Sequence, residues 1–418
     1  MQVRSRSGRD YYYDTSTNRL STRLFDDLVC THIHYQTSSE YEFSKIGMFT
    51  IEITQECNLR CLYCCYSGEY SGRRKHNATS LTKDNMEYCV DFICKHSSPN
   101  VPVIYIAFYG GEALLFWEKI KWIIEELVKR NHNRTFEFSI STNGTLLHSK
   151  IIDEICSIDN LFVTITIDGD KEIHDRCRMT SSGKGTFDVI MSNLKEFKSR
   201  FPIAFRERVR FISTVKSIQD LIPLNNFWMR SDILKENRPQ HIASIIPNFD
   251  KGDKVSNDKE KFAQIYDLGI NYILDGKDNI ITDELYNLIK TVRMRDYNIE
   301  PSTLTLSTCI NKPNSCFISS DGNLYVCERF CTPLNIGSLK KGFDEEKCRE
   351  LNHKYIYLKN KFCSECWARR LCRRCAMSLN FNEKQFMQYC DSERMQIELA
   401  LRYYCELKEI RKGINMGK

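Results

Sequence analysis

The stretch ITQECNLRCLYCCYSGEYSG, residues 53–72, decides the fold of this chain. It holds four cysteines within nine positions, Cys57, Cys61, Cys64 and Cys65, and the first three are spaced C-x3-C-x2-C. A structural zinc site needs four ligands and usually takes them as two C-x2-C pairs. Three thiolates on one loop would leave one iron of a 4Fe–4S cluster open to a substrate or cofactor. The spacing therefore favours an iron–sulfur cluster, and zinc with Cys65 as fourth ligand is the alternative.

Short β-rich apolar runs alternate with segments of helical period on both sides of this loop. The strand candidates are residues 49–54, 103–111, 135–144, 161–169, 208–215 and 241–249. A strand followed by a helix, repeated, predicts parallel strands joined by right-handed crossovers. Six such units predict an α/β fold, a partial (β/α)6 barrel, with its chemistry at the carboxyl ends of the strands.

Composition limits the class of protein. The chain has 418 residues, 42% of them apolar, which allows two or three units with buried cores. Its 20 cysteines exceed ordinary usage, but a chain of this size does not need disulfide staples, so we expect reduced or metal-bound thiols. A net charge of +6 is too mild to indicate a nucleic-acid partner. No stretch approaches the ~20 apolar residues of a membrane span, and we expect a cytoplasmic protein.

Several predicted strands end in glycine-rich or polar motifs. YGGE (109–112) follows the second strand, STNG (141–144) ends the third and TIDG (166–169) ends the fourth. Glycines let the backbone approach a ligand closely, and an ammonium group is bound by carbonyl or carboxylate oxygens. Motifs at one end of a parallel sheet predict a shared pocket beside the cysteine loop.

The cysteine loop after the first strand resembles that of the radical S-adenosylmethionine superfamily, whose signature is C-x3-C-x-aromatic-C. This resemblance implies that Cys57, Cys61 and Cys64 hold a 4Fe–4S cluster whose open iron binds S-adenosylmethionine. One electron then cleaves the cofactor to a 5'-deoxyadenosyl radical that abstracts a hydrogen atom from the substrate. The cofactor-binding residues that it implies are Tyr63, Gly110, Gly111, Glu112, Asn143, Thr166, Asp168 and Arg178. Cys65 lies outside the motif and is expected to be a free thiol.

A second group of cysteines fills the C-terminal region. Its members are Cys309, Cys316, Cys327, Cys363, Cys366, Cys372, Cys375 and Cys390. Eight thiols suit two fully ligated clusters, or two structural zinc ions, which the C-x2-C pairs permit. The stretch SCFISSDGNLYVC (315–327) alternates about an Asp-Gly pair, which predicts a β-hairpin that brings Cys316 near Cys327.

The order of these cysteines resembles the SPASM domain, which is found on radical enzymes that modify peptides and proteins. By this resemblance Cys309, Cys316, Cys327 and Cys375 bind a first auxiliary 4Fe–4S cluster, and Cys363, Cys366, Cys372 and Cys390 bind a second. Cys372 and Cys375 are spaced C-x2-C where the family has C-x3-C, which leaves Cys331 as a substitute ligand. Four arginines within CWARRLCRRC (366–375) would offset the negative charge of thiolate clusters, and a nucleic-acid patch is the alternative.

Three further stretches resemble parts of the peptide and sulfatase maturases. Residues 167–190 match the segment after the fourth strand, where His174 and Asp175 are expected to stabilise the loop and the following helix. Glu328 follows Cys327 at the position where sulfatase maturases carry an aspartate that acts as a general base. Glu328 is therefore a candidate base, and a surface or arginine-paired glutamate is the alternative. Residues 10–29 resemble the start of a leader-peptide recognition segment, and a hairpin covering the barrel edge is the alternative.

The resemblance implies an enzyme of three parts: an N-terminal extension (1–48), a radical SAM barrel with bridging helices (49–300) and a SPASM domain with a hairpin and short helices (301–418). We expect a maturase that oxidatively modifies a ribosomally made, leader-bearing peptide, most simply by a side-chain crosslink, with flavodoxin or ferredoxin as electron donor. An auxiliary cluster would accept the surplus electron. The alternatives are a sulfatase maturase that makes formylglycine, and a non-catalytic iron–sulfur carrier or zinc adaptor.

Overall fold

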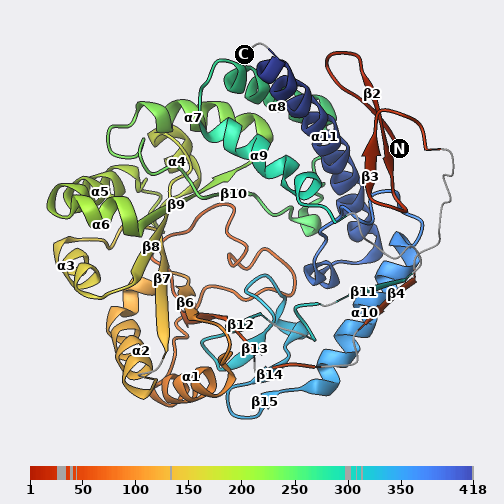
Figure 1. Ribbon diagram of the computed structural model, residues 1–418. Coiled ribbons are helices and arrows are strands. Elements are labelled where there is room, and N and C mark those ends of the chain that lie inside the picture. The colour runs from red at the N-terminus through yellow and green to blue at the C-terminus, as the bar shows by residue number, and fades with distance from the viewer. Residues whose placement is uncertain are drawn as a thin grey trace.

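A computed structural model describes residues 1–25, 34–37, 41–43, 45–131, 134–296, 303–306, 308–311 and 314–416. The barrel occupies one side of the molecule, and the C-terminal region packs against its open side (Figure 1). None of the helices in the described ranges is both long and apolar enough to cross a lipid bilayer.

The centre of the fold is a sheet of ten strands in the order β10-β9-β8-β7-β6-β5-β12-β13-β14-β15. The barrel strands are β5 (Met48–Thr54), β6 (Val103–Gly110), β7 (Thr135–Thr142), β8 (Leu161–Thr166), β9 (Val209–Val215) and β10 (His241–Ser244). Neighbouring barrel strands are parallel. The predicted α/β fold with six strand–helix units is confirmed.

Helices cover the outer face of these strands (Figure 1). They are α1 (Lys83–His96), α2 (Trp117–Arg130), α3 (Ser149–Ser157), α4 (Lys171–Cys177), α5 (Phe187–Arg200), α6 (Pro202–Arg208) and α7 (Leu221–Arg230). Each of the longer ones is amphipathic; α2, for example, buries Ile120, Ile123 and Leu127 at helical spacing. Thr82 caps α1 by accepting a hydrogen bond from the Asn85 backbone N–H. Sequence period and capping thus account for where these helices lie.

The predicted hairpin is present and extends the barrel sheet. Strands β12 (Ser315–Ile318) and β13 (Asn323–Tyr325) are antiparallel, and the turn contains Gly322 at φ 85°. On its other side β12 pairs in parallel with β5, and Cys316 lies opposite Phe49. Two short strands, β14 (Gly337–Ser338) and β15 (Gly342–Phe343), complete the sheet. The C-terminal region is therefore joined to the barrel by backbone hydrogen bonds.

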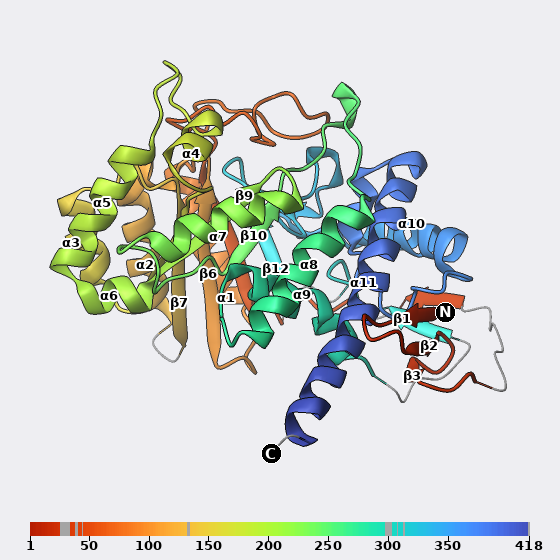
Figure 2. The same cartoon turned by 90° about the horizontal axis from the view of Figure 1, so that it is seen from above.

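The remaining elements form a layer beside the barrel. They are α8 (Lys259–Leu274), α9 (Ile280–Arg293), α10 (Glu345–Cys363), α11 (Glu383–Met416) and the parallel pair β4 (His34–Thr37) and β11 (Thr303–Leu306). Helix α11 packs against α8 and α9 through a core that includes Leu285 and Leu399, and its far end leaves the body of the protein (Figure 2). The bridging segment thus supports the C-terminal helix.

The N-terminal residues form a three-stranded antiparallel sheet of β1 (Gln2–Arg4), β2 (Asp10–Asp14) and β3 (Arg19–Ser21). Tyr11 and Tyr13 are buried against Ala368, Leu371 and residues of α11. Figure 2 shows this sheet beside α11. This sheet packs on the C-terminal region. The alternative expected from the sequence was a hairpin that covers the edge of the barrel. The part of the leader-recognition prediction from residue 26 onward lies outside the described residues.

Candidate active site

The first cysteine loop lies at the carboxyl end of β5 and borders a cavity of about 310 Å³. Cys57, Cys61 and Cys64 all line this cavity, as do Gly110 and Gly111 at the end of β6. The structure therefore brings the three predicted cluster ligands and the glycine motif together. We call this space the cofactor cavity.

A neighbouring segment fixes the shape of the cysteine loop. The Arg60 backbone N–H donates to Met179 O at 2.7 Å, and the Leu62 N–H donates to Cys177 O at 2.9 Å. The acceptors lie at the end of α4 and in the stretch just after it. That stretch is held in turn by Asp175, whose side chain accepts hydrogen bonds from the start of α5. His174 is fully buried beneath it, which agrees with the structural role predicted for these two residues.

The two glycines permit a close backbone approach that no side chain could accommodate. A Cβ on Gly111 would lie 2.1 Å from Glu56 O, and one on Gly110 would lie 2.4 Å from Thr54 O. Gly111 N–H donates to Thr54 O at 2.9 Å, so the end of β6 packs directly on the backbone that leads into the cysteine loop. The glycines thus set the distance between the two sides of the cavity.

Gly111→Ala is expected to destabilise the protein by about 3 kcal/mol or more and to reduce iron retention, because a backbone oxygen blocks the new methyl group. Gly276→Ala is the matched control: Gly276 has φ 67° but nothing within 4 Å, so only about 1–2 kcal/mol of backbone strain is expected. Thermal melting and iron content after anaerobic reconstitution measure both variants. Equal losses would show that close packing at Gly111 is unimportant.

Three of the predicted cofactor-binding residues form one hydrogen-bonded group. The Tyr63 hydroxyl donates to Asp168 and accepts a hydrogen bond from Arg178 Nη1 at 2.7 Å. Asp168 also accepts from the Thr214 N–H at 2.8 Å. Burial raises the pKa of Asp168, and the Arg178 guanidinium opposes that rise. Tyr63 and Arg178 line the cofactor cavity, whereas Asp168 lies behind them and orients Tyr63.

Glu112 is positioned differently from the prediction. Its buried carboxylate accepts hydrogen bonds from Leu114 N–H at 3.1 Å, Thr142 Oγ1 at 2.7 Å and Asn143 N–H at 2.7 Å. It caps the 3-10 helix η1 (Ala113–Phe116) and ties β6 to the end of β7. It does not line the cofactor cavity, so the ammonium-binding role implied by the resemblance lacks geometric support. Asn143 and Thr166 do line it.

Some residues of the cavity wall were not singled out from the sequence as binding residues. They include Tyr66, His76, Tyr109, Ser141, Thr214 and residues 243–246. His76 Nε2 lies 3.5 Å from Cys64 Sγ. Tyr66 and Tyr109 had a weak signal, since Tyr66 follows the cysteine motif and Tyr109 opens the YGGE motif. His76 and Thr214 had none, because the fold alone brings them to the cavity.

The donor set of the cofactor cavity fits an iron–sulfur cluster and an anionic ligand. Burial raises the pKa of Cys57 to about 11 and that of Cys64 to about 12, and a bound metal centre would lower both by stabilising the thiolates. Arg178 is buried, and its Nε has no hydrogen-bond partner among the described residues. Burial raises the pKa of Cys61, and the charge of the guanidinium that carries this free Nε opposes the rise. A carboxylate in the cavity would accept a hydrogen bond from the Arg178 Nε–H.

The four thiols predicted for the second auxiliary cluster border one small cavity of about 20 Å³. They are Cys363 at the end of α10, Cys366, Cys372 and Cys390 on α11. Arg369 and Arg394 border the same cavity and lie next to these thiols. In the described chain no three Cys, His, Asp or Glu side chains converge closely enough to hold a single metal ion. A cubane cluster, in contrast, spaces its thiolates on separate irons.

The first auxiliary group is brought together only in part. Cys327, Cys309 and Cys375 are electrostatic neighbours. Burial raises the pKa of Cys309 and of Cys327, and a charge on Cys375 raises both further. Cys316 is not with them. It is fully buried between α1 and α10, and its thiol neighbours are Cys89 and Cys348.

The physical reason is the two-residue period of β12. Phe317 faces the barrel side, where its ring lies 6.4 Å from that of Tyr109. Cys316 must then face the opposite side, toward the helices. The expected approach of Cys316 to Cys327 and its inclusion in this ligand set are therefore not what the structure shows. Cys331, the suggested substitute, lies beside Gly72.

Cys316→Ala is expected to leave the iron content unchanged and to cost about 1–2 kcal/mol of stability through a small core cavity. Cys327→Ala is expected to lower the iron content by the amount that one auxiliary cluster holds. Iron and sulfide analysis of both variants after reconstitution gives the comparison. Iron loss in Cys316→Ala equal to that in Cys327→Ala would instead place Cys316 among the ligands.

Glu328 lies outside the cofactor cavity. It borders a second cavity of about 330 Å³, between the cysteine loop and the hairpin, together with Arg74 and Asp321. Tyr66 borders both cavities, and its hydroxyl donates to the Glu328 backbone O at 3.0 Å. The Glu328 carboxylate is one-third exposed and lies 3.6 Å from Arg329. This position matches the arginine-paired alternative better than that of a base at the reacting atoms.

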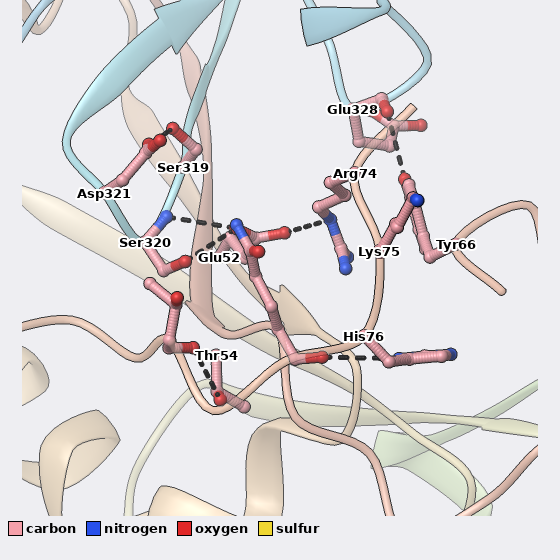
Figure 3. A network of polar contacts seen from close by, with 12 residues as sticks. Glu52, Thr54, Tyr66, Arg74, Lys75, His76, Ser319, Ser320, Asp321 and Glu328 are labelled. Carbon is pink, nitrogen blue, oxygen red and sulfur yellow. Dashed lines mark hydrogen bonds and ion pairs between the residues drawn. The ribbon is translucent and has the colours of Figure 1, made fainter. Parts of the chain in front are cut away.

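A buried ion pair joins the cysteine loop to the hairpin (Figure 3). Glu52 on β5 pairs with Arg74, and its other oxygen accepts hydrogen bonds from Ser320 N–H at 3.1 Å and Ser320 Oγ at 2.8 Å. The Arg74 guanidinium stacks 3.5 Å from the centre of the Tyr66 ring. Glu52 is fully buried, so this network fixes the two halves of the site against each other.

The model of the Radical SAM superfamily matches residues 51–212, which include the cysteine loop and the ends of β6, β7 and β8. Residues 51–212 form a radical SAM domain. The matched residues contain all three motif cysteines of the first loop and most of the cofactor cavity.

Known relatives align with most of this chain. A cysteine-type anaerobic sulfatase-maturating enzyme of Clostridium novyi is 25% identical over 322 residues, which are 72% of this chain and 78% of that enzyme. The mycofactocin maturase MftC of Mycolicibacterium smegmatis is 24% identical over 285 residues, 66% of this chain and 63% of the relative. The solved structure "Native anSMEcpe with bound AdoMet and Cp18Cys peptide" has a TM-score of 0.64 at 19% identity, covering 88% of this chain and 99% of its own. The fold is thus shared over barrel and C-terminal region.

Proposed function

We propose that this radical SAM enzyme oxidatively modifies a ribosomally made peptide, most simply by crosslinking two side chains. The observation that carries this is the convergence of Cys57, Cys61 and Cys64 on one cavity with the glycine end of β6. Relatives named as maturases of sulfatases and of mycofactocin, and a related fold with a bound peptide, support a peptide or protein substrate.

Different residues of the cofactor cavity would bind different parts of the cluster and the cofactor. Cys57, Cys61 and Cys64 would hold a 4Fe–4S cluster, and Arg178 would bind the cofactor carboxylate through its free Nε. Asn143 and Thr166 offer polar atoms to the rest of the cofactor. When bound, the cluster and S-adenosylmethionine supply a carbon radical able to abstract hydrogen. Tyr63 is held by Asp168 as a rigid wall.

We further propose three clusters. The second auxiliary cluster would be held by Cys363, Cys366, Cys372 and Cys390, which share a cavity. The first would be held by Cys309, Cys327 and Cys375. Arginines beside these thiols lower the cost of burying anionic clusters. A low-potential donor such as flavodoxin or ferredoxin would supply electrons.

A sulfatase maturase is the second candidate. Sequence similarity to anaerobic sulfatase-maturating enzymes favours it, since two of them align with 72% and 82% of this chain. Against it stands Glu328, which replaces the expected aspartate and lies outside the cofactor cavity. An electron carrier or zinc adaptor would need no cavity of about 310 Å³ lined by glycine, asparagine and threonine beside its cluster.

Anaerobic co-expression with each short open reading frame beside the gene tests the proposal. Mass spectrometry of every small peptide is compared with and without the enzyme. Loss of a hydrogen pair, located by fragmentation to two side chains, would support crosslinking and identify the bond. Unchanged peptides together with formylglycine on a sulfatase in the same cells would favour the second candidate.

A further inference from the structure

Two further cavities lead away from the cofactor cavity along the boundary between the barrel and the C-terminal region. The middle cavity measures about 420 Å³ and the outer one about 650 Å³. Ile246 borders both the cofactor cavity and the middle cavity. Phe249, Asn382 and Gln385 border both the middle and the outer cavity. The three spaces are therefore in series, and we call the middle and outer cavities the seam groove.

The walls of the seam groove are fixed by hydrogen bonds. Tyr70 from the cysteine loop donates through its hydroxyl to Ile246 O at 3.1 Å. Thr332 N–H donates to Gly72 O at 2.9 Å, which holds the C-terminal side to the same loop. The Phe249 and Phe381 rings, 5.8 Å apart and edge to face, connect the two walls where the middle cavity meets the outer one. The groove thus exists before any ligand binds.

Its size and charge indicate the class of ligand. Each cavity alone has the volume of a pocket for a small molecule, and a series of such cavities suits an extended chain. The charged residues of the outer cavity are two acids, Asp253 and Asp391, and two bases, Lys254 and Lys384. This balance offers no concentrated positive charge for a phosphate or nucleotide.

Three side-chain amides line the groove, and backbone N–H groups bind their oxygens. Asn382 Oδ1 accepts from Gln385 N–H at 3.0 Å, and Gln385 Oε1 accepts from Asn382 N–H at 3.1 Å. Gln388 Oε1 accepts from Val255 N–H at 3.3 Å. The amide oxygens are thus occupied, while the NH2 groups of these three residues have no acceptor among the described residues. Gln385 and Gln388 are three residues apart on α11, so they share a face of that helix.

We propose that the seam groove binds the segment of the substrate peptide next to the modified residue, in an extended conformation. The NH2 groups of Asn382, Gln385 and Gln388 donate to backbone carbonyls of that segment. A carbonyl is present at every residue, so such contacts tolerate different side chains, and the reactive residue reaches the cofactor cavity past Ile246. This inference rests on the proposed function for its choice of ligand.

The test uses Gln385→Glu together with Gln388→Glu. Glutamate keeps the oxygen that accepts from the Asn382 and Val255 N–H groups, so the fold is retained, but it removes both NH2 donors. Gln396→Glu adds one negative charge on α11 outside both cavities and is the control for added charge on that helix. The enzyme is reconstituted anaerobically with iron, sulfide and S-adenosylmethionine, and phage-displayed random short peptides are selected on it. The most enriched peptide is then synthesised with a fluorophore and with a benzophenone at either end.

We expect the double variant to weaken peptide binding about tenfold or more, since two hydrogen bonds of roughly 1 kcal/mol each are lost. Gln396→Glu should bind as the unsubstituted enzyme does, and melting temperatures should agree. Benzophenone crosslinks should fall on residues 249–257 or 382–391. An unchanged Kd in the double variant, crosslinks only elsewhere, or no enriched peptide would overturn the proposal. Because binding is measured without turnover, its failure is separate from a failure of the co-expression test.

Discussion

Cys57→Ala is expected to abolish cleavage of S-adenosylmethionine, whereas Cys363→Ala is expected to retain cleavage and lose modified peptide. Cys57 lines the cofactor cavity, and its loss leaves two of the three thiols of the C-x3-C-x2-C motif. Removing an outer partner of a metal site typically costs 10–100-fold in activity, so loss of a ligand itself should exceed about 100-fold. The assay uses dithionite as the reductant, and chromatography measures the methionine and 5'-deoxyadenosine that are formed.

The contrast with Cys363 follows from where the thiols lie. Cys363 borders the small cavity at the end of α10, apart from the cofactor cavity, so uncoupled cleavage should continue. The matched control is Cys405→Ala, because Cys405 is a buried thiol on α11 that belongs to none of the three groups. It should retain both cleavage and iron. Loss of cleavage in Cys363→Ala as complete as in Cys57→Ala, or modified peptide formed by Cys363→Ala, would contradict the account of three clusters.

Glu52→Ala is expected to lower the free energy of unfolding by about 3–5 kcal/mol, because it leaves the buried Arg74 guanidinium without its partner. Total stability is typically about 5–15 kcal/mol, so this loss should be obvious in a thermal melt. The same change frees Ser320 from β5 and should loosen the cysteine loop. Iron retention should therefore fall even well below the melting temperature.

Two comparisons isolate the buried pair. Replacing both partners, Glu52→Met with Arg74→Leu, removes the uncompensated charge and should recover much of the stability. Glu196→Ala removes an exposed pair with Arg200 on α5 and should cost no more than about 0.5 kcal/mol. If Glu52→Ala behaved like Glu196→Ala, the ion pair would have no part in joining the hairpin to the loop.

The sequence predicted the barrel well because its signals are local. Each strand from β5 to β10 is a short apolar run followed by a segment of helical period. Parallel strands are joined by right-handed crossovers, so this alternation determines the order of the barrel. The three cysteines of the first loop are also a local signal, since a spacing of three and two residues on one loop leaves little freedom. The hairpin around Gly322 followed from turn chemistry in the same way.

Direction of side chains was the main source of error. Cys316 has the right spacing for a cluster ligand, but strand alternation points it into the core with Cys89. Glu112 follows the glycines as expected, yet three backbone and hydroxyl donors occupy its carboxylate. His76 reaches Cys64 only through the path of the loop after the cysteines. Such placements depend on tertiary packing, which no short motif encodes.

The pairing of β12 with β5 also has a consequence during synthesis of the chain. Glu52 and Ser320, which meet where these strands end, are 268 residues apart in sequence. Ribosomes add about 5–20 residues per second, so β5 waits roughly 15 to 50 seconds before its partner strand is made. Until then its free backbone edge and the thiols of the first loop are exposed to other chains. A newly made barrel should therefore need a chaperone, or early delivery of iron, before its C-terminal half emerges.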